Sequence, residues 1–572
     1  MTSAFPAGSA LPPLEDTDMV AARLHDGLAR DAARVVLTLT AADGSDREVT
    51  GGALAARAGE FAARFEALGC RGHVVGVCLY HGLDLYAAFI GALWAGCIPT
   101  MVPPPSPRME PEKYARSFRH VVHYVLPRAM VLDAAAHERL VAAGHLEAIA
   151  VELIIPDSVS GGAVPAIARS APEDVILIQH SSGTTGLQKG IALSNRAVLQ
   201  HNSAYAASLG MTRDDVIVSW LPLYHDMGFI ACFLLPLLER IPIVAMSPFD
   251  WVRTPGLLLE KITEHRGTLC WLPNFAFALL ARSVRPARLK GALDLSSVRA
   301  WVNSSEPVLD SSMRAFAHAF GALGVHPHQL TASYAMAENV YAVTQSLPGE
   351  YRTLRVHAGI YRDAHRAERA GNDAASLDFV SNGRAVSGTE VIVLDDRDEG
   401  VADGAVGQIA LRGGYRFSGY HGRDDLTAAS MTADGWYRTG DLGFLHDGEL
   451  YVTGRKKDLI IIQGRNFYPG DLEASAGTLD GVAPGRVVAF GIQDSASGTE
   501  QLILLAESTN ATAADATLPL RIRAHIAQEF DCTPSVVRIV PPRWLVKSSS
   551  GKLARSENRE KYLAQLAEQR DV

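Results

Sequence analysis

A loop rich in glycine and hydroxyl side chains follows one of the apolar runs of this sequence. The run is VILIQH at 175–180, and the loop is SSGTTGLQKG at 181–190. Glycines let the backbone approach phosphate oxygens, hydroxyls donate hydrogen bonds to them, and Lys189 supplies positive charge. The order of glycine and lysine is not that of a Walker A loop. Taken alone, the loop could be an ordinary turn, but its chemistry suits phosphate.

Four further segments carry residues suited to nucleotide and acid chemistry. They are YAMAE at 334–338, GWYRTGD at 435–441, GRKKD at 454–458 and SSGK at 549–552. Together with the loop at 181–190, and in the same order, they resemble the motifs of the adenylate-forming superfamily. That superfamily includes acyl-CoA synthetases, peptide-synthetase adenylation domains and luciferases. Ordered motifs spread over most of a chain are far more specific than any one of them.

The resemblance implies that ATP and a carboxylic acid react to give an acyl-adenylate and pyrophosphate. Both reactants are anionic, so the site must neutralise their charge and align the carboxylate with the α-phosphorus. The implied catalytic residues are Lys552, His225 and Glu338. The implied nucleotide-binding residues are Ser182, Thr184, Thr185, Lys189, Ser333, Tyr334, Asp441, Arg455 and Lys457. Thr184 and Glu338 are the implied ligands of Mg²⁺, a hard cation that prefers oxygen.

Each implied role has a chemical reason. Tyr334 would stack on adenine, and Asp441 would accept both ribose hydroxyls while Arg455 supports the same ribose. Lys552 would bridge the carboxylate and the α-phosphate, a task suited to a flexible point charge. Lys457 stands at the family's hinge, about which a small domain is expected to rotate between adenylation and acyl transfer.

Three segments are similar to those of the fatty acyl-AMP ligases within the superfamily. They are WLPLYHDMG at 220–228, PNFAF at 273–277 and GRNFYPGDLE at 464–473. The polar stretch at 346–376 stands where those ligases carry an insertion that hinders the conformation needed for CoA. The resemblance therefore implies a fatty acid as the substrate and transfer of the acyl group to the phosphopantetheine of an acyl carrier protein. We expect that carrier to be a separate chain, because only a short segment follows Lys552.

Other acceptors and roles stay open. An acyl-CoA synthetase would share the first half-reaction, and an amine acceptor would use the adenylate to form a C–N bond. A non-catalytic descendant would bind ATP or an acyl ligand as a sensor, although it would not need Lys552. Trp271 and Leu272 replace the small residues expected before PNFAF. Trp271 either shortens the acyl tunnel, since a Trp side chain buries about 150–250 Å², or packs in the core.

Hydrophobic periodicity predicts the elements that position these residues. From about Val35 to Val302, apolar runs alternate with helix-like segments, which indicates α/β structure with buried parallel strands. Examples are the runs at 74–80, 129–134, 175–180 and 241–246 and the helix-like segments at 51–68 and 257–265. After Val380 the runs become short strands with Gly- and Asp-rich turns, followed by an amphipathic helix near 518–530.

The predicted fold class is α/β, in two domains. A large N-terminal domain of layered mixed and parallel sheets flanked by helices spans 1–455, and a small mobile α+β domain at 456–572 carries the catalytic lysine. The chain's 572 residues exceed the ~250–300 at which a single core stops growing. The stretch at 346–376 is predicted to be an inserted loop or a small surface subdomain.

Composition narrows the class of partner. A net charge of −9 with both signs scattered argues against nucleic acid, which requires a basic stripe. The uncharged stretch from Leu85 to Val102 nearly reaches membrane-spanning length, but its glycines and Pro99 favour a buried helix running into a strand, so no transmembrane segment is expected. No signal peptide is evident. Six cysteines without a CxxC pair indicate reduced thiols and a cytoplasmic location.

Overall fold

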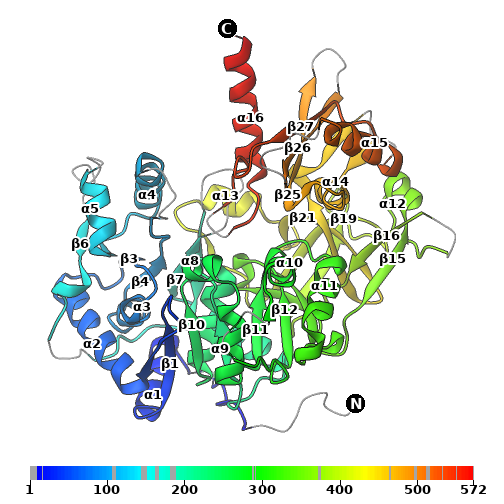
Figure 1. Ribbon diagram of the computed structural model, residues 1–572. Helices are drawn as coiled ribbons and strands as arrows, with labels where there is room; N and C mark the ends of the chain where they lie inside the picture. Colours follow the sequence, from blue (N-terminus) through cyan, green and yellow to red (C-terminus); the bar gives the residue numbers. More distant parts are fainter. Residues whose placement is uncertain are drawn as a thin grey trace.

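The apolar runs of the first half form the inner strands of two large sheets in this computed structural model (Figure 1). The structure describes residues 9–15, 17–105, 111–142, 151–161, 166–180, 189–286, 289, 291–371, 375–462, 465–494, 499–509, 516–530, 532–548 and 551–570. The α/β class predicted from the sequence is confirmed.

The first sheet has nine strands in the order β17-β14-β13-β12-β11-β9-β10-β1-β2. Its strands are β1 (Val35–Thr40), β2 (Asp46–Thr50), β9 (Ile217–Ser219), β10 (Ile243–Met246), β11 (Leu269–Leu272), β12 (Ala300–Asn303), β13 (Leu330–Ala335), β14 (Ala342–Gln345) and β17 (Arg384–Ala385). The strands from β13 to β1 pair in parallel, and β14, β17 and β2 are antiparallel at the two ends. Parallel strands buried on both faces account for the near-continuous apolar runs.

The second sheet has seven strands in the order β20-β8-β7-β4-β3-β5-β6. Its strands are β3 (Val74–Cys78), β4 (Ile98–Met101), β5 (Ala129–Leu132), β6 (Glu152–Ile154), β7 (Val175–His180), β8 (Gly190–Ser194) and β20 (Gly419–Tyr420). The uncharged stretch from Leu85 to Val102 lies mainly in helix α3 (Leu83–Trp94) and strand β4, as expected. None of the described helices combines the length and the apolar character that crossing a bilayer requires.

Helices cover both large sheets (Figure 1). In this part of the chain they are α1 (Val20–Arg30), α2 (Gly51–Ala67), α4 (Pro111–Val125), α5 (Ala134–Ala142), α6 (Asn195–Ser208), α7 (Leu235–Leu238), α8 (Pro248–Arg253), α9 (Leu257–His265), α10 (Asn274–Ser283) and α11 (Asp310–Phe320). Single turns occur at η1 (Pro156–Ser158), η4 (Gly321–Leu323), η5 (Pro327–Gln329) and η6 (Ala337–Asn339), and η2 (Met227–Leu234) is a π-helix. Helical turns of the π type often occur at functional sites.

The segment predicted as an insertion is a small structured unit. Strands β15 (Thr353–His357) and β16 (Ser376–Val380) form an antiparallel pair, and helix α12 (Ala358–Ala364) follows the first of them. An antiparallel sheet comes next, with β18 (Thr389–Leu394), β19 (Gly407–Gly413), β21 (Tyr437–His446) and β22 (Glu449–Arg455). Helix α13 (Asp424–Ala429) lies between β20 and β21 in the chain.

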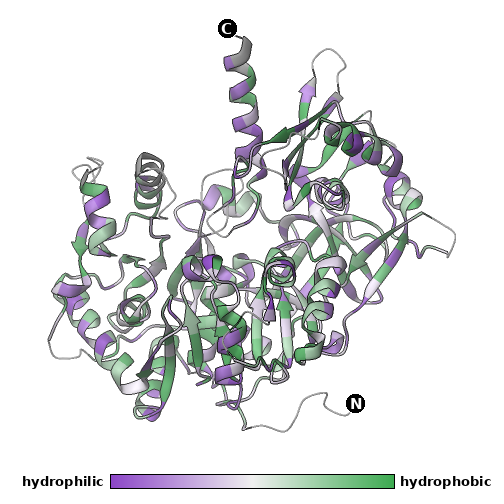
Figure 2. Cartoon of the chain, viewed as in Figure 1, coloured by the Kyte–Doolittle hydropathy of each residue, from purple (hydrophilic) through white to green (hydrophobic). Residues whose placement is uncertain are grey.

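The last part of the chain builds a smaller α+β unit with separate hydrophobic clusters. It contains η7 (Lys456–Asp458), β23 (Ile460–Ile462), β24 (Arg465–Phe467), α14 (Pro469–Ala476), β25 (Val482–Asp494), β26 (Thr499–Ser508), α15 (Leu518–Phe530), β27 (Val536–Val540) and α16 (Arg555–Arg570). The inner strands of the molecule are mostly hydrophobic, and α16 is mainly hydrophilic (Figure 2). All six cysteines are buried thiols.

Candidate active site

Three neighbouring parallel strands end at one edge of the nine-stranded sheet, and each leads into a functional segment. Phe275 follows β11, Glu306 follows β12, and Glu338 follows β13. The Phe275 N–H donates a hydrogen bond of 3.0 Å to Glu306 Oε2, which ties two of these segments together. Ligands of α/β proteins bind beyond the carboxyl ends of parallel strands, so this edge is where a substrate is expected.

The residues predicted to hold adenosine converge beside this edge. The Tyr334 hydroxyl donates to Asp441 Oδ2 over 2.7 Å, and Arg455 Nε lies 3.2 Å from Asp441 Oδ1. Asp441 and Arg455 face each other across β21 and β22, and the charge of Asp441 raises the pKa of Arg455. Ser333, next to Tyr334, is buried and donates its hydroxyl to the Thr344 carbonyl. The Asp441 carboxylate is therefore oriented with both oxygens engaged.

Lys189 and Glu338 both contact Tyr420, one at its ring and the other at its hydroxyl. The Lys189 ammonium lies 4.4 Å from the centre of the Tyr420 ring, and the Tyr420 hydroxyl donates to Glu338 Oε1 over 3.1 Å. Tyr420 is brought there by the pairing of β20 with β8, the strand that begins just after Lys189. The predicted phosphate ligands Ser182, Thr184 and Thr185 lie outside the described residues. The end of the phosphate loop and the predicted metal ligand thus share one aromatic neighbour.

The environment of Glu338 suits a bound cation. Burial raises the pKa of this carboxyl group, and its side-chain hydrogen bonds come from the hydroxyls of Tyr420 and Tyr437. Neither partner carries a positive charge. A hard divalent cation that prefers carboxylate oxygen would supply the missing charge, so the residues present fit Mg²⁺.

His225, Asp226 and Lys552 form a hydrogen-bonded group between the two parts of the molecule. His225 Nδ1 lies 2.7 Å from Asp226 Oδ1, and Lys552 Nζ lies 3.4 Å from His225 Nε2. Asp226 also accepts the Met227 N–H at the start of η2 over 2.8 Å, which fixes the carboxylate. Because Nδ1 faces the Asp226 carboxylate, Nε2 is the ring nitrogen that faces the Lys552 ammonium.

The loop that carries Lys552 fits closely against Phe275. Gly551 has φ +86°, and a β-carbon at this position would lie 3.2 Å from the Phe275 ring. Only glycine combines that backbone with that approach. The Lys547 ammonium, in the same loop, lies 5.3 Å from the centre of the Phe275 ring. Burial lowers the pKa of Lys547 to about 8.

Burial lowers the pKa of Lys552 overall, although the nearby carboxylates of Glu306 and Asp226 oppose this shift. For Asp226, burial would raise the pKa, but the charge and hydrogen bond of His225 and the charge of Lys552 lower it overall. The Lys552 ammonium lies beside His225 at the strand edge, where the carboxylate or phosphate of a substrate would meet it.

Lys457 lies between two ion pairs at the junction with the smaller unit. Lys456 Nζ lies 2.9 Å from Asp396 Oδ1, in the turn after β18. Asp458 Oδ2 lies 2.6 Å from Arg555 Nη1, at the start of α16. The residue before Lys457 is thus fixed to the larger unit and the residue after it to the smaller one.

The unit at 346–376 touches the smaller unit through helix α12 and its end. The rings of Tyr361 and Tyr468 lie 5.6 Å apart. The Arg362 guanidinium lies 4.6 Å from the centre of the Phe530 ring, and Asn466 Nδ2 lies 3.4 Å from His365 Nε2. Any rotation of the smaller unit must therefore break these contacts.

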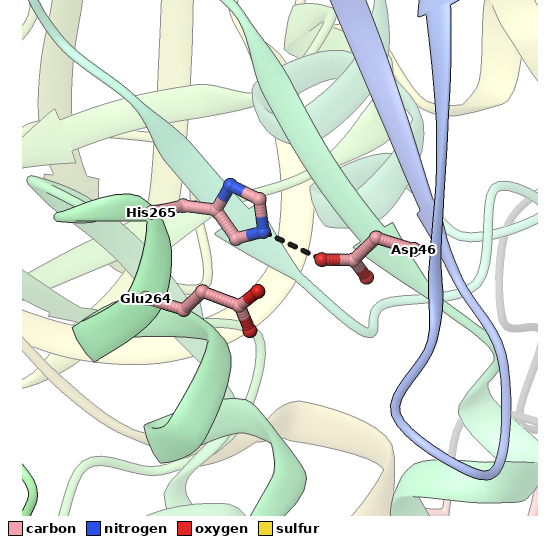
Figure 3. Close-up of side chains that lie close together, drawn as sticks. All are labelled: Asp46, Glu264 and His265. Carbon is pink, nitrogen blue, oxygen red and sulfur yellow. Dashed lines mark hydrogen bonds and ion pairs between the residues drawn. The ribbon is translucent and has the colours of Figure 1, made fainter.

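Within the described part of the chain, one group of side chains has the spacing of a metal site, far from these residues in the sequence (Figure 3). Its members are Asp46, Glu264 and His265. Lys261 Nζ donates to both Asp46 Oδ2 and Glu264 Oε2 over 2.7 Å. Because the Lys261 ammonium already bonds both carboxylates, we interpret this group as a charge cluster and not as a metal centre.

The structure brings together eight of the residues singled out in the sequence. They are Lys189, His225, Tyr334, Glu338, Asp441, Arg455, Lys457 and Lys552. Sequence analysis gave no role to Asp226, Glu306, Tyr420 or Arg555. The position of Asp226 directly after His225 was an available signal, but nothing local in the sequence links Tyr420 to Lys189, since strand pairing makes that contact.

Comparisons with known proteins were made on the sequence and on the fold. Residues 28–421 match the family model described as AMP-binding enzyme. A putative acyl-CoA synthetase of Caulobacter vibrioides is 30% identical over 84% of this chain and 84% of its own length. A long-chain-fatty-acid–AMP ligase of Mycolicibacterium smegmatis is 29% identical over 92% of this chain and 90% of its own. A structure from a study of fatty acyl-adenylate ligases of E. coli and L. pneumophila superposes with TM-score 0.88 at 26% identity, covering 97% of this chain and 100% of that one.

Proposed function

We propose that this chain, which belongs to the AMP-binding enzyme family, activates a carboxylic acid as its acyl-adenylate and passes the acyl group to the phosphopantetheine thiol of a separate acyl carrier protein. The chain is an acid–adenylate ligase, similar to fatty acyl-AMP ligases in sequence and fold. ATP is the co-substrate. Membership of the AMP-binding enzyme family does not by itself identify the acceptor.

The observation that carries the proposal is the position of Lys552 beside His225, at the strand edge where the other predicted site residues gather. In the first step, a carboxylate oxygen attacks the α-phosphorus of ATP, the bond to the β-phosphate oxygen breaks, and pyrophosphate leaves. The Lys552 ammonium stabilises the charge that develops between the carboxylate and the α-phosphate. Asp226 orients His225, which in turn lies against Lys552.

The remaining residues would hold the nucleotide. Asp441, with Tyr334 and Arg455 on its two oxygens, would bind the ribose, and Lys189 would neutralise the β- and γ-phosphates. Glu338 would hold Mg²⁺, which, when bound, supplies positive charge to the phosphates. No nucleic acid partner is proposed.

In the second step, a thiol attacks the acyl carbonyl carbon, the bond to the phosphate oxygen breaks, and AMP leaves. We propose the domain boundary at 455/456, with Lys457 as the hinge for the rotation that admits the thiol. The contacts of Tyr361, Arg362 and His365 with the smaller unit oppose that rotation. These contacts support a carrier protein as the acceptor. The binding energy of a carrier protein can offset the cost of breaking them, and free CoA contributes less binding energy. The buried thiols agree with a cytoplasmic location.

The test is an assay with Mg-ATP, acids from acetate to palmitate plus aromatic acids, and either CoA, holo-acyl carrier protein or its apo form. Mass spectrometry follows acyl-AMP, acyl-CoA and acyl-carrier. We expect acyl-AMP to accumulate, to persist with CoA or apo-carrier, and to be consumed by holo-carrier. Lys552→Gln is the control for adenylation. Rapid acyl-CoA formation would instead make this an acyl-CoA synthetase, and consumption by amines alone would assign it to C–N bond formation.

A further inference from the structure

Three aromatic side chains pack together under the strand edge that carries the catalytic residues. Trp271 comes from β11, Tyr205 from α6 and Tyr341 from the segment just before β14, and all three are fully buried. The ring centres of Trp271 and Tyr205 are 6.4 Å apart, and those of Tyr205 and Tyr341 are 5.4 Å apart. We call these three side chains the aromatic floor.

Hydrogen bonds hold the floor in one arrangement. Trp271 Nε1–H donates to the Tyr205 hydroxyl over 2.9 Å, and that hydroxyl donates to Gln345 Oε1 over 3.0 Å. Gln345 in turn donates through Nε2 to the Ser346 carbonyl over 2.7 Å. Because Trp271 Nε1–H and the Tyr205 hydroxyl both have buried acceptors, turning Trp271 aside would leave polar groups without partners in the interior. Trp271 and Tyr205 are therefore the fixed part of the floor and not a movable gate.

The floor lies next to the position of the reacting carboxylate. From Trp271, strand β11 leads through Pro273 to Phe275, against which the Lys552 loop packs. Burial raises the pKa of Tyr341, and the nearby Asp226 carboxylate adds to this shift. Tyr341 is thus close to the carboxylate that orients His225. The aromatic floor thus lies inward of the strand edge at which Lys552 and His225 meet.

We infer that the aromatic floor ends the acyl subsite close to the carboxylate, so that the substrate is a compact acid with a short or branched chain and not a long-chain fatty acid. This inference rests on the proposed function. Close-packed interiors have no room for extra methylene groups beside three buried rings, and a buried indole fills the volume that a chain would need.

The rival route for a long chain is the apolar cavity of about 40 Å³ between the two large sheets. Its walls include Leu79, Val102, Ala245 and Met246, and it adjoins the segment that ends at Tyr224, directly before His225. A chain that used this cavity would bypass the floor, so the two routes predict different chain-length preferences and different sensitive residues.

The test measures kcat/KM for pyrophosphate release with acetate, butyrate, hexanoate, laurate and palmitate. The wild-type enzyme should prefer the short acids to laurate by at least about tenfold, the scale at which pockets discriminate chain length. Trp271→Gly should raise the ratio of kcat/KM for laurate to kcat/KM for butyrate by about tenfold or more. Trp271→Phe, which removes the hydrogen bond and keeps most of the bulk, should retain the short-acid preference.

Trp301→Gly is the matched control. Trp301 is also fully buried, but it lies on the opposite face of the sheet, because its neighbour Val302 is the residue in register with Trp271. It packs on Phe316 of α11, with ring centres 4.9 Å apart. Its removal should cost stability without changing the chain-length preference.

Three outcomes would overturn the inference. One is a wild-type enzyme that activates laurate or palmitate as well as butyrate. Another is loss of long-acid activity when Ala245→Phe fills the cavity, which would show that the chain lies there. The third is an equal change in preference from Trp301→Gly and Trp271→Gly. Failure of the proposed function looks different, since no acid would then give acyl-AMP.

Discussion

Arg555 joins the hinge to the body of the smaller unit, and its replacement tests whether that junction controls adenylation. Arg555 donates to Asp458 Oδ2 over 2.6 Å and to both oxygens of Glu473 over 2.8 and 2.9 Å. Glu473 also accepts the Ala489 N–H over 2.9 Å. One side chain thus holds η7, α14 and α16 together, three residues after Lys552.

Arg555→Met should lower the free energy of unfolding, because it leaves the Asp458 and Glu473 carboxylates without this ion-pair partner. Removing one partner of a buried ion pair costs about 3–5 kcal/mol, and surface pairs cost about 0–1 kcal/mol. Because 23% of the Arg555 side chain is exposed, we expect the free energy of unfolding to fall by about 2–4 kcal/mol in Arg555→Met. At ~4 °C per kcal/mol for a unit of this size, the Tm of the smaller unit should fall by roughly 8–16 °C.

The loss of stability in Arg555→Met should depend on pH, and the Glu473 carboxyl group sets the direction of this dependence. Burial raises the pKa of Glu473, and Arg555 opposes that rise. Without Arg555 the folded-state pKa moves further above the ordinary value of 4.5. The folded variant then binds a proton more readily than the unfolded chain, so its stability falls as pH rises from that value through the raised pKa. The defect should be largest at neutral and higher pH and smaller in acid.

The assay combines thermal unfolding across pH with pyrophosphate release at saturating substrates. We expect kcat to fall about tenfold, with smaller changes in KM, because the Lys552 loop is less firmly held while the nucleotide residues are untouched. Arg196→Met, which removes an exposed pair with Glu173, is the control and should change stability by under about 1 kcal/mol. Adding Asp458→Asn and Glu473→Gln to Arg555→Met should recover part of the stability. No recovery, or an unfolding curve equal to that of the wild type, would refute the charge argument.

Three further predictions concern the catalytic residues. Lys552→Gln should slow acyl-AMP formation by about 10²–10³-fold with little change in Tm, and a rate near that of the wild type would remove Lys552 from the chemistry. Asp226→Asn should shift the alkaline limb of the pH–rate profile to lower pH, because the Asp226 carboxylate raises the pKa of Lys552 and only the ammonium is active; an unshifted limb would contradict this. Glu338→Gln should raise the Mg²⁺ concentration for half-maximal activity by about tenfold or more, and an unchanged midpoint would exclude Glu338 as a ligand.

The sequence allowed the elements to be predicted better than their contacts. The apolar run at 241–246 contains β10, and the helix-like segment at 257–265 is α9. They were found because burial on both faces of a strand leaves a continuous apolar run and burial of one helix face leaves a period. The segment at 346–376 was recognised as separate, but its hairpin and helix were not, since its apolar residues show no clear period. Trp271 could not be assigned to tunnel or core, because its place depends on Tyr205, a residue on another element.

The hinge, too, is defined by contacts between residues distant in the sequence, which its motif does not show. The motif at 454–458 places charged residues in a row, and nothing in the row shows which of them move together. The structure gives Asp458 a partly buried partner, Arg555, and gives Lys456 an exposed one, Asp396, whose side chain is 92% accessible. Exposed pairs hold weakly and partly buried pairs hold firmly. In the rotation that we propose, the Lys456 pair would therefore break first while Asp458 travels with the smaller unit, which leaves the backbone of Lys457 to absorb the change.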